Sequence, residues 1–399
     1  MYIPPKEILE KYSKVLINFA LNSGDGIKKG DIVYLATQTS GLPLAKEIYK
    51  TIITSGGNPI VIIQDDDLKL IQLQNGSDEQ ISFFPEKFYK GLADQIDHYV
   101  RILAEDDPLY LSKADPKKVI LGSRSTKPFR DWLDEKEDQG RFTWTLCLYG
   151  TEGAAKEAGI SIENYWEQIN RACFLDETDP VAKWKSVTSE MQSILKTLNG
   201  MSIQKIHVEA KDTDLWVQIG EQRKWLGGSG RNIPSFEIFT SPNWRGVEGT
   251  VFFDLPLYRY GNIIKDIRLE LKDGIIVKAT AAENEDLLKE MISQKNADKI
   301  GEFSLTDRRF SKITKFMANT LFDENFGGDF GNTHLAIGKA YHDACMLDPK
   351  NLTDADFQAL GYNDSPEHTD IIATTDRVVT AVLPDGSKKV IYEGGEFLI

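Results

Sequence analysis

The sequence predicts two domains of different classes: an α/β domain with a Rossmann-like or flavodoxin-like parallel sheet at residues 1–185, and an α+β domain with a largely antiparallel sheet at residues 186–399. In the first half, short apolar runs of strand length alternate with segments of helical periodicity, which is typical of βαβ units. Beyond residue 200 the apolar residues alternate with period two between turn signals. The chain of 399 residues is also too long for one ordinary hydrophobic core.

Strands and helices alternate in the first domain. Asp31–Ala36 and Pro59–Ile63 are apolar runs of strand length, and Leu42–Ser55 between them has helical periodicity. This unit predicts a right-handed crossover and a parallel sheet. No G-x-G-x-x-G or P-loop motif follows these strands, so a scaffold is favoured over a nucleotide site. The pattern continues with strands at Lys118–Gly122 and Phe142–Leu148, and with helices near Ile8–Phe19, Phe129–Glu135 and Gly153–Ala158.

A helix predicted at Pro180–Leu198 joins the two halves, and Asp179 is placed to cap it. The sequence of the second domain then shows the pattern of strands joined by tight turns that is typical of β-hairpins. Two Asp-Gly pairs, at 273–274 and 385–386, indicate tight turns because both residue types accept positive φ. Alternating apolar residues predict strands within Val208–Val217, Thr250–Leu255, Ile267–Leu271 and Ile275–Ala279, and helical periodicity predicts helices at Leu287–Gln294 and Ser311–Leu321.

Charge and composition exclude several classes of partner. The net charge of −14 comes from 61 acidic and 47 basic residues, whereas nucleic-acid and anionic-membrane binders need concentrated Lys and Arg. No run of about 18 apolar residues occurs, and the N-terminus lacks a basic segment followed by an apolar one, so neither membrane insertion nor secretion is expected. Cys147, Cys173 and Cys345 form no C-x-x-C pair, which favours a reducing, cytoplasmic location.

Imidazole and carboxylate groups of the second domain occur in strand-like settings. His368 and Asp370 stand two residues apart before an apolar run, and in a strand such side chains point the same way. A nitrogen and an oxygen donor would then reach one point, which suits a cation of the zinc, cobalt or manganese type. A surface His and Asp at a strand start is the alternative. Glu237 and Glu302 lie in apolar segments, where each carboxylate must face solvent or have a strong partner.

His334 follows the segment 325–332, which holds three glycines and therefore suggests a shaped loop. If the chain becomes helical after His334, Tyr341 lies on the same face two turns later, and its phenol reaches what the imidazole reaches. A loop histidine and a packing tyrosine are the alternative. Neither H-E-x-x-H nor G-x-S-x-G occurs, so a metal site must be assembled from separated segments. Two His and three carboxylates are a typical inventory for two divalent cations.

Five segments carry a resemblance to a known family, in the same order and with similar spacing. They are Asn232–Pro242, Ile300–Glu302, Asn319–Asn325, His334–Gly338 with Tyr341, and His368–Asp370. From about residue 230 to 396 the chain resembles the M29 metallopeptidases, the family of aminopeptidases T and S, and its first half is more loosely similar to that family's α/β domain. Two features depart from the family: Phe236 stands where many members carry an acidic residue, and the link 326–333 is longer.

The resemblance implies a homodimer with a centre for two divalent metal ions, for which different members use zinc, cobalt or magnesium. It also implies the roles of six residues. Glu237, Glu302, His334, His368 and Asp370 would be metal ligands, and Tyr341 would touch a metal or hydrogen-bond the reacting carbonyl oxygen.

We therefore expect a metal-dependent aminopeptidase, a peptide hydrolase that releases residues from a free N-terminus by means of metal-activated water. Two cations would lower the pKa of a bridging water from about 16 toward about 7. Tyr341 would stabilise the oxyanion, and Glu302 is a candidate base. Asp323 and Glu324 are candidates for binding the substrate's amino group.

Two alternative functions remain open at this point. One is another dinuclear metal hydrolase, such as a phosphoesterase, which would need a cationic anchor from residues such as Arg308, Arg309 or Lys339. The other is a non-catalytic binding protein that keeps the same fold.

Overall fold

A computed structural model describes residues 2–399, which form two compact units. The first comprises the described residues up to Lys185 together with the short segment Ser229–Ser235, and the second comprises Ser186–Gly228 and Phe236–Ile399. The sequence pattern gave no sign that 229–235 returns to the first unit. Across residues 2–399 no helix has both the length and the apolar character needed to cross a membrane.

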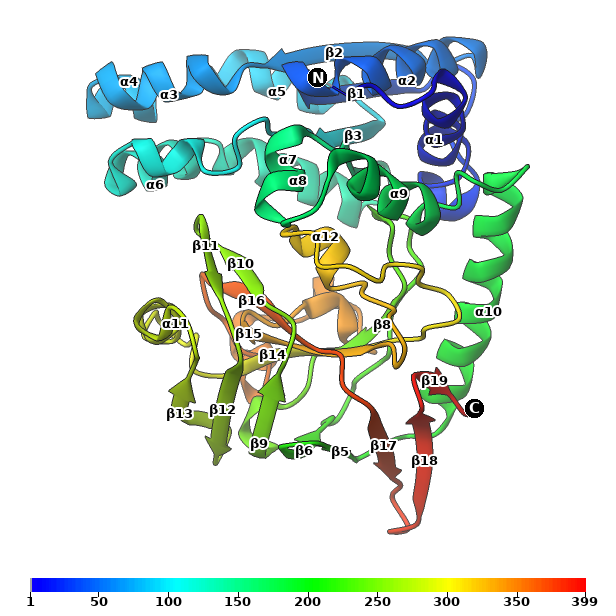
Figure 1. The fold of residues 1–399 in the computed structure, drawn as a ribbon, viewed down its shortest axis with the longest axis vertical. Coiled ribbons are helices and arrows are strands. Elements are labelled where there is room, and N and C mark those ends of the chain that lie inside the picture. Colours follow the sequence, from blue (N-terminus) through cyan, green and yellow to red (C-terminus); the bar gives the residue numbers. More distant parts are fainter. Residues whose placement is uncertain (1) are drawn as a thin grey trace. The chain divides into compact units, whose positions relative to one another are not determined.

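The first unit contains a five-stranded parallel sheet in the order β2-β1-β3-β4-β7 (Figure 1). Helices α5 and α7 pack on one face of it, where Leu92 and Leu133 join the buried cluster of Tyr34 and Ala36. The strands are β1 (Ile32–Gln38), β2 (Asn58–Gln64), β3 (His98–Leu103), β4 (Thr143–Leu148) and β7 (Asn232–Ile233). The helices are α1 (Lys6–Asn18), α2 (Leu42–Thr54), α3 (Asp66–Asn75), α4 (Asp78–Ser82), α5 (Glu86–Gln95), α6 (Pro116–Ser125), α7 (Lys127–Asp138), α8 (Glu152–Glu157), α9 (Ile162–Ala172), η1 (Asn22–Gly24), η2 (Thr39–Gly41) and η3 (Tyr110–Lys113).

One predicted strand of this unit is wrong. Lys118–Gly122 lies within helix α6, because Asp115 caps the helix by accepting the backbone N–H of Lys117 at 2.9 Å and Pro116 occupies the first turn. An apolar run of this length does not distinguish a strand from a helix. The third strand of the sheet is instead β3, whose buried and partly buried residues alternate.

The second unit contains two antiparallel sheets, of eight strands in the order β13-β12-β9-β6-β5-β17-β18-β19 and of four in the order β16-β15-β14-β8. The eight strands are β5 (Lys205–Ala210), β6 (Thr213–Gln218), β9 (Val247–Phe253), β12 (Ile267–Lys272), β13 (Ile275–Thr280), β17 (Arg377–Val382), β18 (Lys388–Glu393) and β19 (Glu396–Phe397). The four are β8 (Glu237–Thr240), β14 (Ile300–Thr306), β15 (Asn332–Gly338) and β16 (His368–Ala373). A separate hairpin and the helices complete the unit: β10 (Leu257–Arg259), β11 (Asn262–Ile264), α11 (Glu285–Ile292), α12 (Thr320–Asp323), α13 (Asp354–Ala359), η4 (Trp244–Gly246), η5 (His342–Ala344) and η6 (Pro349–Asn351).

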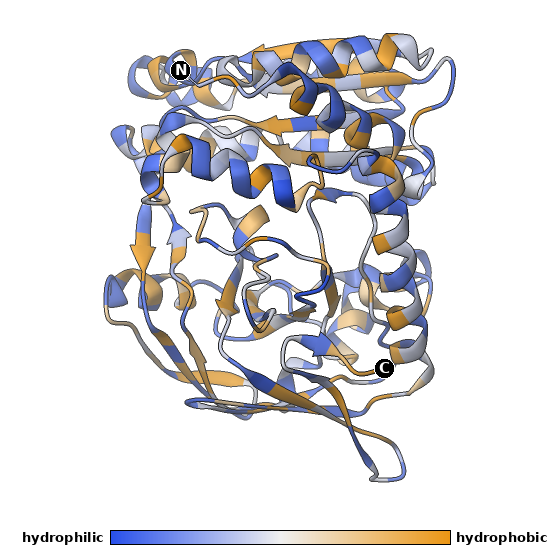
Figure 2. Cartoon of the chain, turned by 45° about the vertical axis from the view of Figure 1, so that its right-hand side comes forward, coloured by the Kyte–Doolittle hydropathy of each residue, from blue (hydrophilic) through white to orange (hydrophobic). Residues whose placement is uncertain are grey.

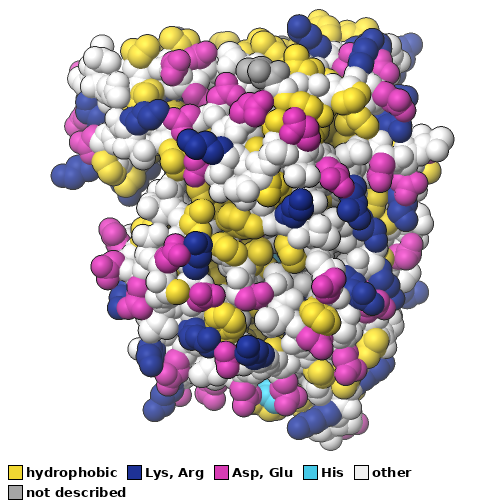
Figure 3. Space-filling model, viewed as in Figure 1, with side chains coloured by type: hydrophobic (Ala, Val, Ile, Leu, Met, Phe, Trp, Pro, Cys, Tyr) yellow, Lys and Arg dark blue, Asp and Glu magenta, His cyan; other side chains and the backbone are white. Residues whose placement is uncertain are grey.

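Helix α10 (Pro180–Gly200) contains residues of both units, as the predicted joining helix does. Hydrophobic and hydrophilic residues alternate along it in Figure 2, which is expected of a helix with one face on a core. On the face seen in Figure 3, Lys and Arg are interspersed with Asp and Glu and form no continuous basic surface.

Two further predictions for the second unit need correction. The helix expected at Ser311–Leu321 is mostly irregular chain, and only α12 is helical there. The carboxylate of Asp323 accepts the backbone N–H groups of Met317 at 2.7 Å and Asn319 at 2.9 Å, so a side chain satisfies these donors in place of helical carbonyls. The segment Val208–Val217 is a hairpin of β5 and β6, because Asp212 adopts a positive φ at the turn between them.

The four-stranded sheet has an unusual core. Every residue of β14 and β15 is buried, yet the two strands carry Glu302, Ser304 and His334. Buried charged groups cost free energy unless they are paired or bind a metal, so these residues make the four-stranded sheet the candidate functional site.

A buried arginine secures the strand that follows this sheet. Arg377 of β17 is only 2% exposed, and it donates from Nη2 to the Ala373 carbonyl at 2.9 Å and from Nη1 to the Phe330 carbonyl at 3.2 Å, besides a contact with the Thr375 carbonyl. Replacing Arg377 by methionine is expected to lower the free energy of unfolding by about 3 kcal/mol, because three carbonyls lose a charged donor. Urea denaturation measures the change.

The control for this variant is Arg268→Met on β12, which breaks a surface ion pair with Asp212 at 3.1 Å. It is expected to cost less than about 1 kcal/mol, since exposed pairs contribute little. Equal losses in the two variants would contradict the importance of the buried contacts.

Candidate metal centre

The register of the four-stranded sheet gathers acidic and imidazole side chains on one face. Glu302 on β14 is aligned with Ala336 on β15, which is aligned with Asp370 on β16. Side chains two residues apart share a face, so His334 and His368 point to the same side as this row. Glu237 on β8 pairs with Thr306, four residues from Glu302, and also belongs to this face. The small Ala336 leaves space between the carboxylates.

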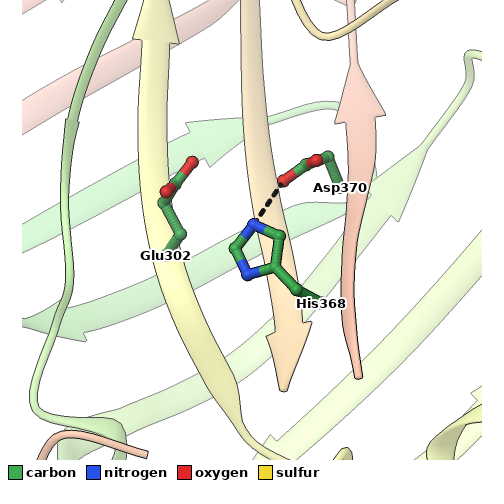
Figure 4. Close-up of side chains that lie close together, drawn as sticks. All are labelled: Glu302, His368 and Asp370. Carbon is green, nitrogen blue, oxygen red and sulfur yellow. Dashed lines mark ion pairs between the residues drawn. The ribbon is translucent and has the colours of Figure 1, made fainter. Parts of the chain in front are cut away.

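The predicted residues come close together. His334 Nε2 lies 3.1 Å from Glu302 Oε1 and 4.0 Å from Asp370 Oδ1, and His368 Nε2 lies 3.4 Å from the same Asp370 oxygen. One ligand atom each from Glu302, His368 and Asp370 lies within 4.8 Å of the others (Figure 4). Oxygen and imidazole nitrogen donors at these separations can hold a divalent cation.

A backbone carbonyl orients His368 as metal-binding histidines usually are oriented. Nδ1 of His368 lies 2.9 Å from the carbonyl oxygen of Lys339, to which it donates, so Nε2 turns toward Asp370. Asp370 Oδ1 is buried and has no hydrogen-bond partner among residues 2–399, although both Nε2 atoms face it. A buried acceptor directed at two imidazoles fits a cation in the same space.

Burial and neighbouring charges shift the pKa values of Glu237 and Asp370 in opposite directions. Glu302 is 4% exposed and Asp370 is 7% exposed. Burial, together with the charge of Glu302, raises the pKa of Glu237 to about 7 against the opposing effect of His334. Burial would also raise the pKa of Asp370, but the charges of His368 and His334 hold it at about 2. Such a cluster is costly without positive charge, and a divalent cation would supply it.

The two imidazoles respond to the same field. Burial alone would lower the pKa of both, yet the hydrogen bond that His334 donates to Glu302, together with the charges of Asp370 and Glu237, raises the pKa of His334 to about 9. Asp370 likewise raises the pKa of His368 to about 9. In the absence of a bound metal cation, the two imidazoles of the site therefore bind protons more strongly than free histidine does.

Glu324, one of the two candidates for binding the substrate's amino group, joins the cluster. It is buried and hydrogen-bonded to Glu237, and burial together with the charges of Glu237 and Asp370 raises its pKa well above the usual range. Asp323 does not join, because its carboxylate is engaged by the backbone N–H groups of residues 317 and 319. The available signal was an acidic pair directly after the apolar Leu321 and Phe322.

Tyr341 lies beside the cluster by a different route from the predicted one. His334 is on a strand and not at the start of a helix, and Tyr341 follows the end of β15, where its backbone N–H donates to Ser241 Oγ at 2.9 Å. Its ring lies 4.7 Å from that of His368. Burial and then the charges of Glu302 and other carboxylates raise the pKa of Tyr341 far above its usual range, so its phenol is a hydrogen-bond donor at neutral pH.

The Phe236 departure has little effect on this centre. Its side chain is fully buried, and its backbone N–H donates to Asn325 Oδ1 at 2.6 Å. Phe236 therefore adds no group to the solvent-facing rim.

The chain also matches known proteins along its whole length. Aminopeptidase 2 of Geobacillus stearothermophilus is 27% identical over 412 residues, which cover 98% of this chain and 97% of that protein. Aminopeptidase T of Thermus thermophilus is 26% identical over 420 residues, which cover 99% of each. The solved structure of wild-type AmpT from Thermus thermophilus superposes with a TM-score of 0.84 at 23% identity, covering 99% of this chain and 100% of that one, and confirms the predicted fold class.

A family model described as thermophilic metalloprotease (M29) matches residues 5–397. This match confirms the resemblance that the five sequence segments indicated. Because it spans almost the whole chain, the chain belongs to the M29 family of metalloproteases.

Proposed function

We propose that this chain is an aminopeptidase with a dinuclear metal centre in its second unit, and that the first unit is a scaffold. The observation that carries the proposal is the buried cluster of two imidazoles and several carboxylates on one face of the four-stranded sheet. The names of the relatives, all aminopeptidases, support the same activity.

We assign the metal ligands to five residues of that face, with Glu324 beside them. A pair of divalent cations (zinc, cobalt or magnesium) would act as Lewis acid and lower the pKa of water. Neutral imidazoles and ionised carboxylates are the forms that bind such cations. The proposed ligands are Glu237, Glu302, His334, His368 and Asp370.

The remaining steps belong to the chain's own groups. The protonated phenol of Tyr341 donates a hydrogen bond to the oxygen of the scissile carbonyl as negative charge develops there. Glu302, buried next to His334, accepts a proton from the attacking water and passes it to the leaving amine. Glu324 binds the free amino group of the peptide, since an ammonium ion next to this carboxylate relieves its unfavourable burial.

A phosphoesterase would need free cationic groups near the cluster. Arg308 instead pairs with Glu396 at 2.7 Å, and Arg309 pairs with Asp307 at 2.5 Å. Neither arginine is therefore a free anchor for a phosphate, whereas the third candidate, Lys339, is exposed at the end of β15.

The substrate class is tested with matched aminoacyl-p-nitroanilides that carry either a free or an acetylated amino group. The metal-loaded protein should cleave only the free amine. Equal cleavage of the acetylated compound would exclude an aminopeptidase. If the protein bound the free-amine compound but cleaved neither compound, the non-catalytic alternative would be favoured.

Replacing Tyr341 by phenylalanine is expected to lower kcat by about 100-fold, because the donor to the developing oxyanion is lost. Steady-state kinetics gives this value, and a metal titration separates the two roles considered for Tyr341. Unchanged metal affinity supports a hydrogen-bond donor, whereas weaker affinity supports a metal ligand. Tyr49→Phe, at an exposed position on α2, should leave both quantities unchanged.

We also propose a homodimer in the cytoplasm. The resemblance to the family supports the dimer, and three buried, unpaired cysteines support a reducing compartment. Light scattering in solution measures the assembly state, and a monomeric mass would refute the dimer.

A further inference from the structure

A second polar cluster lies immediately next to the metal-centre residues in the sequence. Glu367 directly precedes His368 and is buried. Its Oε1 accepts Arg259 Nη2 at 2.8 Å, its Oε2 accepts the Tyr260 hydroxyl at 2.9 Å, and the Thr369 hydroxyl also donates to it. Two of these three donors come from the tip of the β10–β11 hairpin, which pairs with no other strand within residues 2–399.

The hairpin accepts an unfavourable residue at its turn. Arg259 pairs with Asn262, which leaves Tyr260 and Gly261 as a two-residue turn with φ of 50° and 71°. Turns of this kind favour Asn-Gly, and a bulky side chain at positive φ is strained. The Tyr260 side chain is also 59% exposed, so burial of its ring does not offset the strain. Tyrosine contributes two contacts at this position: its ring lies 4.8 Å from the Arg259 guanidinium, and its hydroxyl group donates to Glu367.

Glu367 fixes the place where strand β16 begins. Its carbonyl accepts the backbone N–H of Lys339 at 2.7 Å, and the Lys339 carbonyl in turn accepts Nδ1–H of His368 at 2.9 Å. Thr369 points to the opposite side from its neighbours and ties the strand to the Glu367 carboxylate. A shift of Glu367 would therefore move the His368 ring, and Asp370 with it.

We propose that the hairpin tip, Arg259 with Tyr260, is a positioning element that acts through Glu367 to hold His368 and Asp370 in the geometry that binds metal. The inference rests on the proposed metal centre. Neither tip residue touches the reacting atoms in this assignment. Residues that orient metal ligands without binding the metal themselves typically change metal affinity by about 10–100-fold when they are lost.

Two substitutions at one position separate positioning from simple structural support. Tyr260→Phe keeps the ring and the strained turn but removes the hydroxyl. Tyr260→Asn also removes the hydroxyl contact, because its side chain is too short to reach Glu367, but it creates the Asn-Gly turn that hairpins favour. If the role of Tyr260 is purely structural, the asparagine variant should equal or exceed the wild type in both thermal midpoint and affinity for Co²⁺.

The experiment measures the thermal midpoint of each metal-free protein, the dissociation constant for Co²⁺ by calorimetry, and the visible spectrum of the cobalt-loaded protein. We expect both variants to bind Co²⁺ about 10-fold more weakly than the wild type, with an altered spectrum. Tyr260→Asn should do so without a lower thermal midpoint. Lys265→Met, which breaks an exposed ion pair with Glu283 next to β11, is the matched control and should bind as the wild type does.

The inference is overturned if both variants bind Co²⁺ like the wild type, or if only Tyr260→Phe weakens binding and does so together with a lower thermal midpoint. These results would leave the proposed function intact. A wild-type protein that binds no cation would instead remove the metal centre itself, so the two failures are distinguishable.

Discussion

Replacing His368 by alanine is expected to reduce cleavage of a free-amine substrate by at least about 100-fold, since even indirect partners of a metal ligand typically cost 10–100-fold. The imidazole nitrogen facing Asp370 would be lost, while the strand that carries it would keep its backbone ladder. Steady-state kinetics and circular dichroism of the variant measure the two effects separately.

A matched control exists in the same unit. His207 on β5 also lies between carboxylates, 2.7 Å from Asp214 and 3.4 Å from Glu209, but both of these carboxylates are exposed to solvent. His207→Ala should retain full activity. If His368→Ala remained active while folded, or if both variants lost activity equally, His368 would not belong to the centre.

Removal of metal is the second large effect. After dialysis against a chelator the protein should lose its activity and melt at a lower temperature, because the buried carboxylates around Glu302 and Asp370 then repel one another without a cation. Adding Co²⁺ or Zn²⁺ should restore both, and free metal at about 100 times its Kd stabilises the folded state by about 2.7 kcal/mol. Activity is followed by nitroanilide release and stability by calorimetry.

A chelator already saturated with zinc serves as the control and should leave both properties unchanged. Full activity in excess free chelator, with no metal left by elemental analysis, would contradict a metal-dependent mechanism.

The sequence predicts best where a local period is clear. The side chains of His368 and Asp370 share a face because they lie on a strand, and Glu237 and Glu302 also occupy strands as expected. The period alone could not show that these strands are neighbours. Register between distant segments depends on long-range pairing, which is seen only in the structure. The five matching segments grouped these residues through the resemblance to a family of metallopeptidases.

Predictions failed where side chains replace backbone partners. The segment before α12 has helical periodicity, but Asp323 takes up its backbone donors and holds it in an irregular path. His334 stands after a glycine-rich segment that reads equally well as the start of a helix or of a strand. Its pairing with Ser304 on β14 decides for the strand. The sequence could not decide between Asp323 and Glu324, because the direction of each side chain depends on that irregular path.

The central claim is that Glu237, Glu302, His334, His368 and Asp370 hold two divalent cations. Anomalous X-ray diffraction from crystals loaded with cobalt tests it directly. We predict two anomalous peaks per chain, both within coordination distance of these five side chains. In a crystal of His368→Ala, neither peak should reach full occupancy. A single peak would contradict the dinuclear centre, and peaks elsewhere in the chain would contradict the site.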